Sequence, residues 1–97
     1  MQNEQNEDVF QFLGGTFHQD IESPEHAFEE FLRETSRVYL KDAVLFLKEF
    51  INSALTKEEK NSFIEKSADG VYFPALGHEP IDWLKGITLQ IETEVSN

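Results

Sequence analysis

The sequence predicts an all-α protein, folded as one compact bundle of about five helices, and three observations support this prediction. Apolar residues recur at spacings of three and four over most of the chain, which is the period of an amphipathic helix. Ser, Thr and Pro residues precede these stretches, as they do at the starts of helices. Gly residues follow several of the stretches, as they do at the ends of helices. No convincing alternation of apolar and polar residues indicates a strand, although residues 87–95 leave both helix and strand open.

The first helix is expected over residues 7–13, where acidic residues come first. Val9, Phe10 and Leu13 are expected to share its apolar face. The two consecutive glycines after Leu13 are expected to end it. The preceding polar residues, 1–6, are expected to form a flexible tail, so that residues 7–97 make up a single helical domain.

The second helix is expected to begin at Pro24, because Ser23 can cap it and proline suits the first helical position. His26 takes the third position, where a glutamate would complete a capping box. The apolar stripe of this helix is Ala27, Phe28, Phe31 and Leu32. Thr35 and Ser36 interrupt the pattern and can cap the next helix.

Residues 37–55 have the densest apolar content and are expected to form a helix that is central in the bundle. Thr56 and Glu59 have the spacing of a capping box and are expected to begin a fourth helix. This helix is expected to run to about Ser67 and to end at Gly70.

Residues 71–80 are expected to form a loop in which Phe73 is a core residue. Tyr72 is either a core residue or an exposed anchor, since aromatic residues are enriched in interface hot spots. The last helix is expected to begin near Pro80. Trp83 lies in its apolar stripe and is expected in the core, with its indole N–H bonded to a loop carbonyl.

Composition excludes several classes of function. The chain has 97 residues, 19 of them acidic and 8 basic, and its formal charge of −11 argues against direct binding of nucleic acid or anionic membranes. Without cysteine it forms no disulfide, no thiolate zinc site and no Cys nucleophile. The first eight residues do not resemble a signal peptide, and no apolar run approaches the ~20 residues of a membrane helix. These features are compatible with the cytoplasm.

The negative charge is concentrated near the N-terminus. Residues 1–36 contain nine acidic residues and one basic residue. Glu25 and Glu29 lie four residues apart, and therefore on one face of the second helix, with Glu22 just before it. Such a run is either a solvated helix face or a patch that attracts and docks a basic protein.

His18, Asp20 and His26 are close enough in sequence to form a metal site, but no strict ligand spacing supports one. The alternative is that His18 donates to a backbone carbonyl while Asp20 caps a turn or helix. No serine lies in a GxSxG context, and nothing selects a pair of carboxylates for acid–base chemistry. We therefore expect no enzyme activity, no catalytic residues, no metal and no cofactor.

One stretch of the chain resembles a known family. Residues 12–20, Phe-Leu-Gly-Gly-Thr-Phe-His-Gln-Asp, are similar to the opening of CdiI, a family of immunity proteins in bacterial contact-dependent growth inhibition. The Glu-Glu-Phe-Leu of residues 29–32 and the Trp83–Leu84 pair match later parts of the family pattern. The resemblance covers roughly residues 9–91, and its specific part runs from Phe17 to Asp20.

The resemblance implies an immunity protein in the cytoplasm of the producing cell, bound 1:1 to the C-terminal toxin domain of its cognate CdiA effector. Many such toxins are basic nucleases, so an acidic patch would occlude the active site or the substrate-binding surface. The expected toxin-binding residues are Asp20, Glu22, Glu25, Glu29, Glu30 and Tyr72. The residues expected to hold the fold are Phe17, His18, Gln19 and Trp83.

A different interpretation is a small acidic helical adaptor or regulatory subunit that binds a protein partner through an apolar groove. It predicts binding that depends weakly on salt, because the contacts are apolar. It also predicts that binding is lost when Tyr72 or Leu76 is changed.

Overall fold

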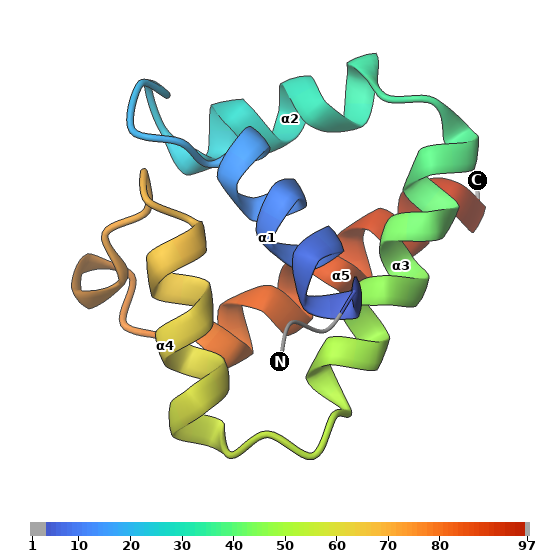
Figure 1. Cartoon of the computed structure of the whole chain (residues 1–97). Helices are drawn as coiled ribbons and strands as arrows, with labels where there is room; N and C mark the ends of the chain where they lie inside the picture. The colour runs from blue at the N-terminus through green and yellow to red at the C-terminus, as the bar shows by residue number, and fades with distance from the viewer. Residues whose placement is uncertain (1–3, 97) are drawn as a thin grey trace.

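The computed structural model describes residues 4–96, and within this range the chain forms five α-helices and one 3₁₀ turn without any strand (Figure 1). The elements are α1 (Glu4–Thr16), α2 (Pro24–Glu34), α3 (Arg37–Ile51), α4 (Lys57–Ser67), η1 (Phe73–Ala75) and α5 (Pro80–Ser96). The predicted all-α fold is confirmed, and residues 87–95 are helical. Because Ile87 and Ile91 bury their side chains, packing outweighs the low helix propensity of β-branched residues there.

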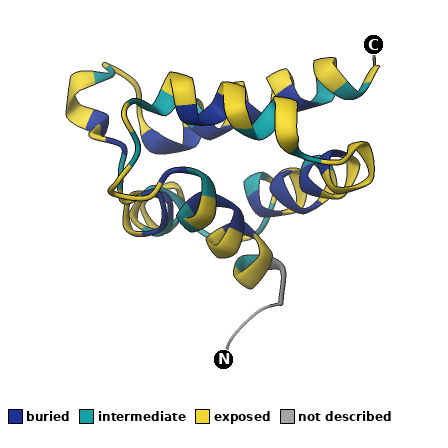
Figure 2. Ribbon diagram, turned by 90° about the horizontal axis from the view of Figure 1, so that it is seen from above, coloured by how far each residue is buried: buried dark blue, intermediate teal, exposed yellow. Residues whose placement is uncertain are grey.

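The helices surround one shared core. α1 and α5 each pack against both α3 and α4, and α2 contacts α1 at one end of the bundle. Figure 2 shows that the buried residues line the inward sides of the helices, while the exposed residues face outward. The core side chains with no exposed surface are Val9, Leu13, Phe17, Ala43, Leu47, Phe50, Ile64, Ala68, Leu84 and Ile91.

α1 extends further in both directions than the sequence predicts. It begins at Glu4, inside the stretch expected to be a tail, and continues through Gly14 and Gly15 to Thr16. Residues 1–3 of the expected tail lie outside the described range. A Cβ on Gly14 would lie 3.6 Å from the Ser67 carbonyl oxygen, an ordinary contact distance, so α1 packs against the end of α4 at this point. We attribute the continuation of α1 through the glycines to this packing, which offsets their poor helix propensity.

The predicted apolar face of α1 was wrong by one residue. Val9 and Leu13 are buried as expected, but Phe10 is 52% exposed. Phe12 takes its place and is 2% exposed. The buried set therefore follows the i, i+3, i+4 spacing of one helix face.

Three helix starts are capped as the sequence predicts. The Ser23 side chain accepts a hydrogen bond from the His26 backbone N–H at 3.1 Å at the start of α2, and Ser36 caps α3. Both halves of the capping box before α4 are present. The Thr56 hydroxyl accepts from the Glu59 N–H at 3.1 Å, and the Glu59 carboxylate accepts from the Thr56 N–H at 2.9 Å.

α3 is shorter than predicted. It ends at Ile51, where the Lys60 ammonium donates to the Ile51 carbonyl at 2.6 Å and satisfies one of the free carbonyls of the helix end. The Ser53 hydroxyl donates to a carbonyl of the last turn at 2.8 Å. Val38 and Leu45 are 72% and 65% exposed, so one side of α3 faces solvent.

Candidate functional site

The loop after α1 is joined to the loop after α4. The Gly70 N–H donates to the Phe17 carbonyl at 2.7 Å, and the Gln19 amide donates to the Asp69 carboxylate. A Cβ on Gly70 would lie only 2.0 Å from the His18 carbonyl oxygen. Gly70 was expected to end a helix, but α4 has already ended before it. The close approach of the two loops is what requires glycine here.

His18 is exposed and is bonded within its own loop. Its Nδ1 accepts a hydrogen bond from the backbone N–H of Asp20 at 3.1 Å. The expectation that His18 donates to a backbone carbonyl was therefore wrong, because the turn brings an N–H group to the imidazole instead.

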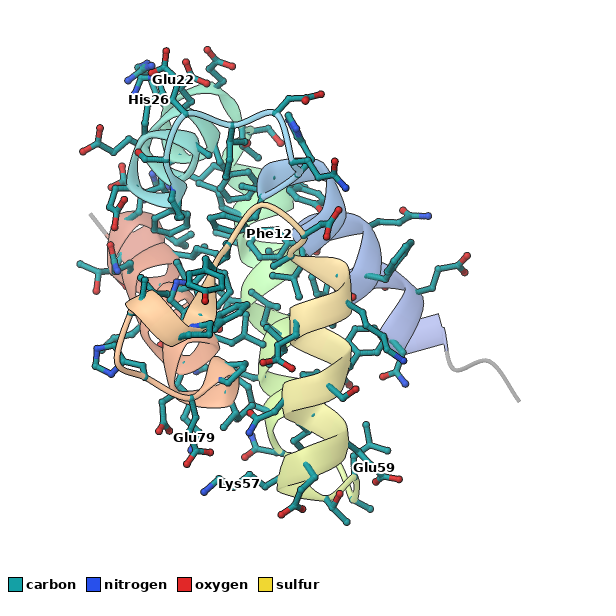
Figure 3. The ribbon with its side chains drawn as sticks, turned by 90° about the vertical axis from the view of Figure 1, so that its left-hand side faces the viewer. Phe12, Glu22, His26, Lys57, Glu59 and Glu79 are labelled. Atoms are coloured by element: carbon teal, nitrogen blue, oxygen red, sulfur yellow. The ribbon has the colours of Figure 1, made fainter. Side chains whose placement is uncertain are left out.

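Phe17 and Trp83 connect this loop to α5. The two rings meet edge to face with their centroids 4.9 Å apart. Trp83 packs in the same way on Phe73, with 5.2 Å between the ring centroids. The ring of Phe12, which is labelled in Figure 3, has its centroid 6.2 Å from that of Phe17. Phe73 is 5% exposed, so its expected place in the core is confirmed. Trp83 is only partly buried, and its indole N–H bonds no carbonyl within residues 4–96, contrary to expectation.

The acidic residues expected to bind a partner lie on two sides of α2. Glu25 and Glu29 line a groove between α2 and α5. Asp20, Glu22 and Glu30 line a smaller hollow of about 260 Å³ on the other side. The structure therefore divides the predicted patch into two neighbouring surfaces that share one helix.

The smaller hollow also contains two histidines. His18 and His26 line it, and the His26 Nε2 lies 3.2 Å from the Glu30 carboxylate. Glu22 and His26 lie together at the outer end of α2 (Figure 3). In the part of the chain that the structure describes, no group of three His, Asp or Glu side chains is arranged to hold a metal ion. The arrangement therefore gives no support to a metal site at His18, Asp20 and His26.

The groove between α2 and α5 is the larger of the two, with a volume of about 590 Å³. Its apolar lining includes Phe28, Trp83 and Ile87, in addition to Phe17 and Leu76. Three carboxylic acids also line it, namely Glu25 and Glu29 from α2 and Asp82 from α5, and none of its lining residues is Lys or Arg. The groove therefore combines an apolar surface with negative charge on both walls.

The contribution of α5 to this groove was missed at the sequence level. Asp82, Gly86 and the neighbouring His78 all line it. The available signal was Gly86, since a glycine inside a helix costs about 1 kcal/mol relative to alanine and calls for a reason. Tyr72 is 71% exposed and is not among the residues of the groove.

A further acidic hollow, of about 300 Å³, lies between α1 and α3. Asp8, Asp42 and Glu49 line it together with Tyr39. Burial is the main cause that raises the pKa of Tyr39 above 10.0, and the charges of Asp8 and Asp42 add to this. Acidic surface is thus not confined to α2. The carboxylates of this hollow can serve as a matched control for charge reversal on α2.

Comparison with known proteins identifies a family model that matches most of the chain. Residues 5–91 match the family model of the CdiI immunity protein. No curated protein and no solved structure matches the chain. Within residues 4–96, no helix has both the length and the apolar content that crossing a bilayer requires.

Proposed function

Because the chain belongs to the CdiI immunity protein family, whose members protect cells from toxins of contact-dependent growth inhibition, we propose that it neutralises its toxin through the acidic surfaces of α2. The proposed contacts are Asp20, Glu22, Glu25, Glu29, Glu30 and the exposed Tyr72. The partner is the C-terminal toxin domain of one cognate CdiA effector, bound 1:1 in the cytoplasm of the producing cell. Protection arises from binding, without catalysis and without a cofactor.

One observation carries this proposal. The two hollows on either side of α2 are lined by carboxylates, and neither has a Lys or Arg in its lining. The formal charge of the whole chain is −11, so the field of the molecule and the local surface have the same sign. Such a surface attracts a basic partner and raises its association rate by one to three orders of magnitude.

A basic nuclease fits this surface. A nuclease binds phosphates with Lys and Arg, and these cations are the natural partners of carboxylates. Glu25 and Glu29 would then stand where substrate phosphates bind, or beside that site. Either position prevents the substrate from reaching the toxin. Tyr72 would supply an aromatic anchor, since tyrosine is enriched among residues that dominate binding energy.

The test is charge reversal in matched pairs. The toxin domain encoded immediately upstream is co-expressed with this chain, and the affinity is measured at low and high salt. We expect Glu25→Lys with Glu29→Lys to weaken binding by more than tenfold. The matched control is Asp42→Lys with Glu49→Lys on α3, which changes the net charge equally and should alter affinity by less than about threefold, or roughly 0.7 kcal/mol.

Each result has a defined meaning. If the α2 pair leaves affinity within about threefold, this surface is not the interface. If both pairs weaken binding equally, net charge and not location is responsible. If the wild-type protein neither binds the toxin domain nor protects the host, the proposed partner is wrong. Binding that resists salt but is lost on Leu76→Ala would favour the adaptor mode through the apolar part of the groove.

A further inference from the structure

The groove between α2 and α5 offers two kinds of surface to one ligand. Glu25 and Glu29 supply carboxylates from one wall, and Asp82 supplies another from the opposite wall. The apolar part includes Phe28 and the partly buried Trp83. A ligand that contacts both the carboxylates and the apolar lining needs a positively charged group on an apolar stem. A flat charged group would also stack on the indole ring.

Gly86 keeps part of this groove open. It lies inside α5 and lines the groove, yet a Cβ added to it would meet nothing within 4 Å. Gly70 is different, because a Cβ there would lie 2.0 Å from the His18 carbonyl oxygen. Packing within the chain therefore requires glycine at 70 but not at 86. A bare helix surface at Gly86 lets the chain of a partner approach α5 closely.

We propose that this groove seats an arginine side chain of the toxin. This inference rests on the proposed function. It goes beyond that function by giving a role in toxin binding to Asp82, Trp83 and Gly86, which are not among the contacts proposed above. The guanidinium group stacks on Trp83 and bonds the carboxylates of the two walls, while the aliphatic stem passes over Gly86. Arginine fits better than lysine because its planar guanidinium both stacks on aromatic rings and binds carboxylates through two parallel hydrogen bonds.

The first test fills the groove without disturbing the fold. Gly86→Gln adds a long neutral side chain with good helix propensity, so we expect an equal or higher melting temperature. We expect its affinity for the toxin domain to fall at least tenfold. The control is Gly15→Gln in α1, another helical glycine whose added Cβ meets nothing within 4 Å, and its affinity should stay within about threefold of wild type. Asp82→Asn, which removes charge at nearly constant size, should weaken binding at least threefold.

The second test observes the groove directly. The chain has one tryptophan, so labelling with 5-fluorotryptophan gives a single fluorine resonance at Trp83. We expect this resonance to shift on addition of unlabelled toxin domain. It should also shift on titration with N-acetylarginine amide, and less with N-acetyllysine amide. In Gly86→Gln the shift caused by the arginine amide should be lost. Equal shifts with both amides would contradict the assignment to arginine.

The outcomes separate this inference from the proposed function. If wild-type protein and Gly86→Gln bind the toxin equally well, the groove assignment is wrong while the immunity function stands. If wild-type protein does not bind the toxin, the proposed partner is wrong. The titration with N-acetylarginine amide needs no toxin, so in that case it still tests whether the groove binds arginine. A shift at Trp83 that Gly86→Gln abolishes supports the assignment, and an unchanged resonance overturns it.

Discussion

Gly70 has less room for a side chain than any other glycine in the structure. Its Cβ position lies 2.0 Å from the His18 carbonyl oxygen and 2.7 Å from the carbonyl carbon. Both are backbone atoms, so a flexible side chain cannot move aside. Gly15 provides the contrast, because nothing lies within 4 Å of the corresponding position.

We expect Gly70→Ala to lower the free energy of unfolding by about 3 kcal/mol, because the added methyl group forces the two loops apart and exposes Phe17. Gly15→Ala should leave stability unchanged or raise it by up to about 1 kcal/mol. Urea denaturation followed by circular dichroism measures both variants. A Gly70→Ala protein as stable as wild type would show that the loops can separate at little cost.

His18 contributes one hydrogen bond within an exposed loop. We expect His18→Ala to lower the free energy of unfolding by about 1 kcal/mol, because the Asp20 N–H loses its partner but can bond to water. Affinity for the toxin should remain within about threefold of wild type. The assignment of His18 to the fold would be wrong if the variant were equally stable and correctly folded but did not bind.

At the scale of helices, polar contacts fix where α5 starts against α4. The Lys57 ammonium lies 3.0 Å from the carboxylate of Glu79, just before α5, and the pair lies at one end of the molecule in Figure 3. The side-chain oxygen of Asn61 accepts from the Ile81 N–H at 2.9 Å, and its amide donates to Glu79 at 3.2 Å. One exposed carboxylate thus links two helix starts.

This link predicts a pH dependence of stability. Hydrogen bonds from Lys57, and then from Asn61, lower the pKa of Glu79 below its ordinary 4.5. Because the pKa is lower in the folded state, the stabilisation is complete above pH 4.5 and is lost as the pH falls through the folded value. The variant Glu79→Gln should therefore lose less stability than wild type on acidification. Urea denaturation at several pH values above and below 4.5 measures this difference.

The helices also show what local sequence can and cannot predict. The caps at Ser23, Ser36 and Thr56 were predictable because each uses contacts within one turn. The course of α1 through its glycines was not, because it depends on packing against α4, which is distant in the sequence. In the same way, the spacing of Glu25 and Glu29 predicts that they share one face of α2. Asp82 lines the same groove only because α2 and α5 pack on the same core, which spacing within one helix does not predict.

At the scale of the whole molecule, charge is expected to control how fast the complex forms. The chain carries a formal charge of −11, and exposed carboxylates line hollows on both sides of α2. We expect the association rate constant with the toxin domain to fall about tenfold from low to physiological ionic strength, because salt screens long-range attraction. The dissociation rate should change much less. Stopped-flow mixing at several salt concentrations measures both, and a flat association rate would argue against electrostatic steering.

The hydrogen bond between the Gly70 N–H and the Phe17 carbonyl has a consequence for folding kinetics. It closes a loop that contains α2, α3 and α4, and it forms only when both chain segments have reached their final places. Forming such a contact early is entropically costly, so this junction should form late in folding. The Gly70 amide should then exchange with solvent deuterium through local separation of the two loops, and faster than the amides of the buried helices. Protection of this amide therefore reports on whether the two loops are joined, separately from the unfolding of the helices.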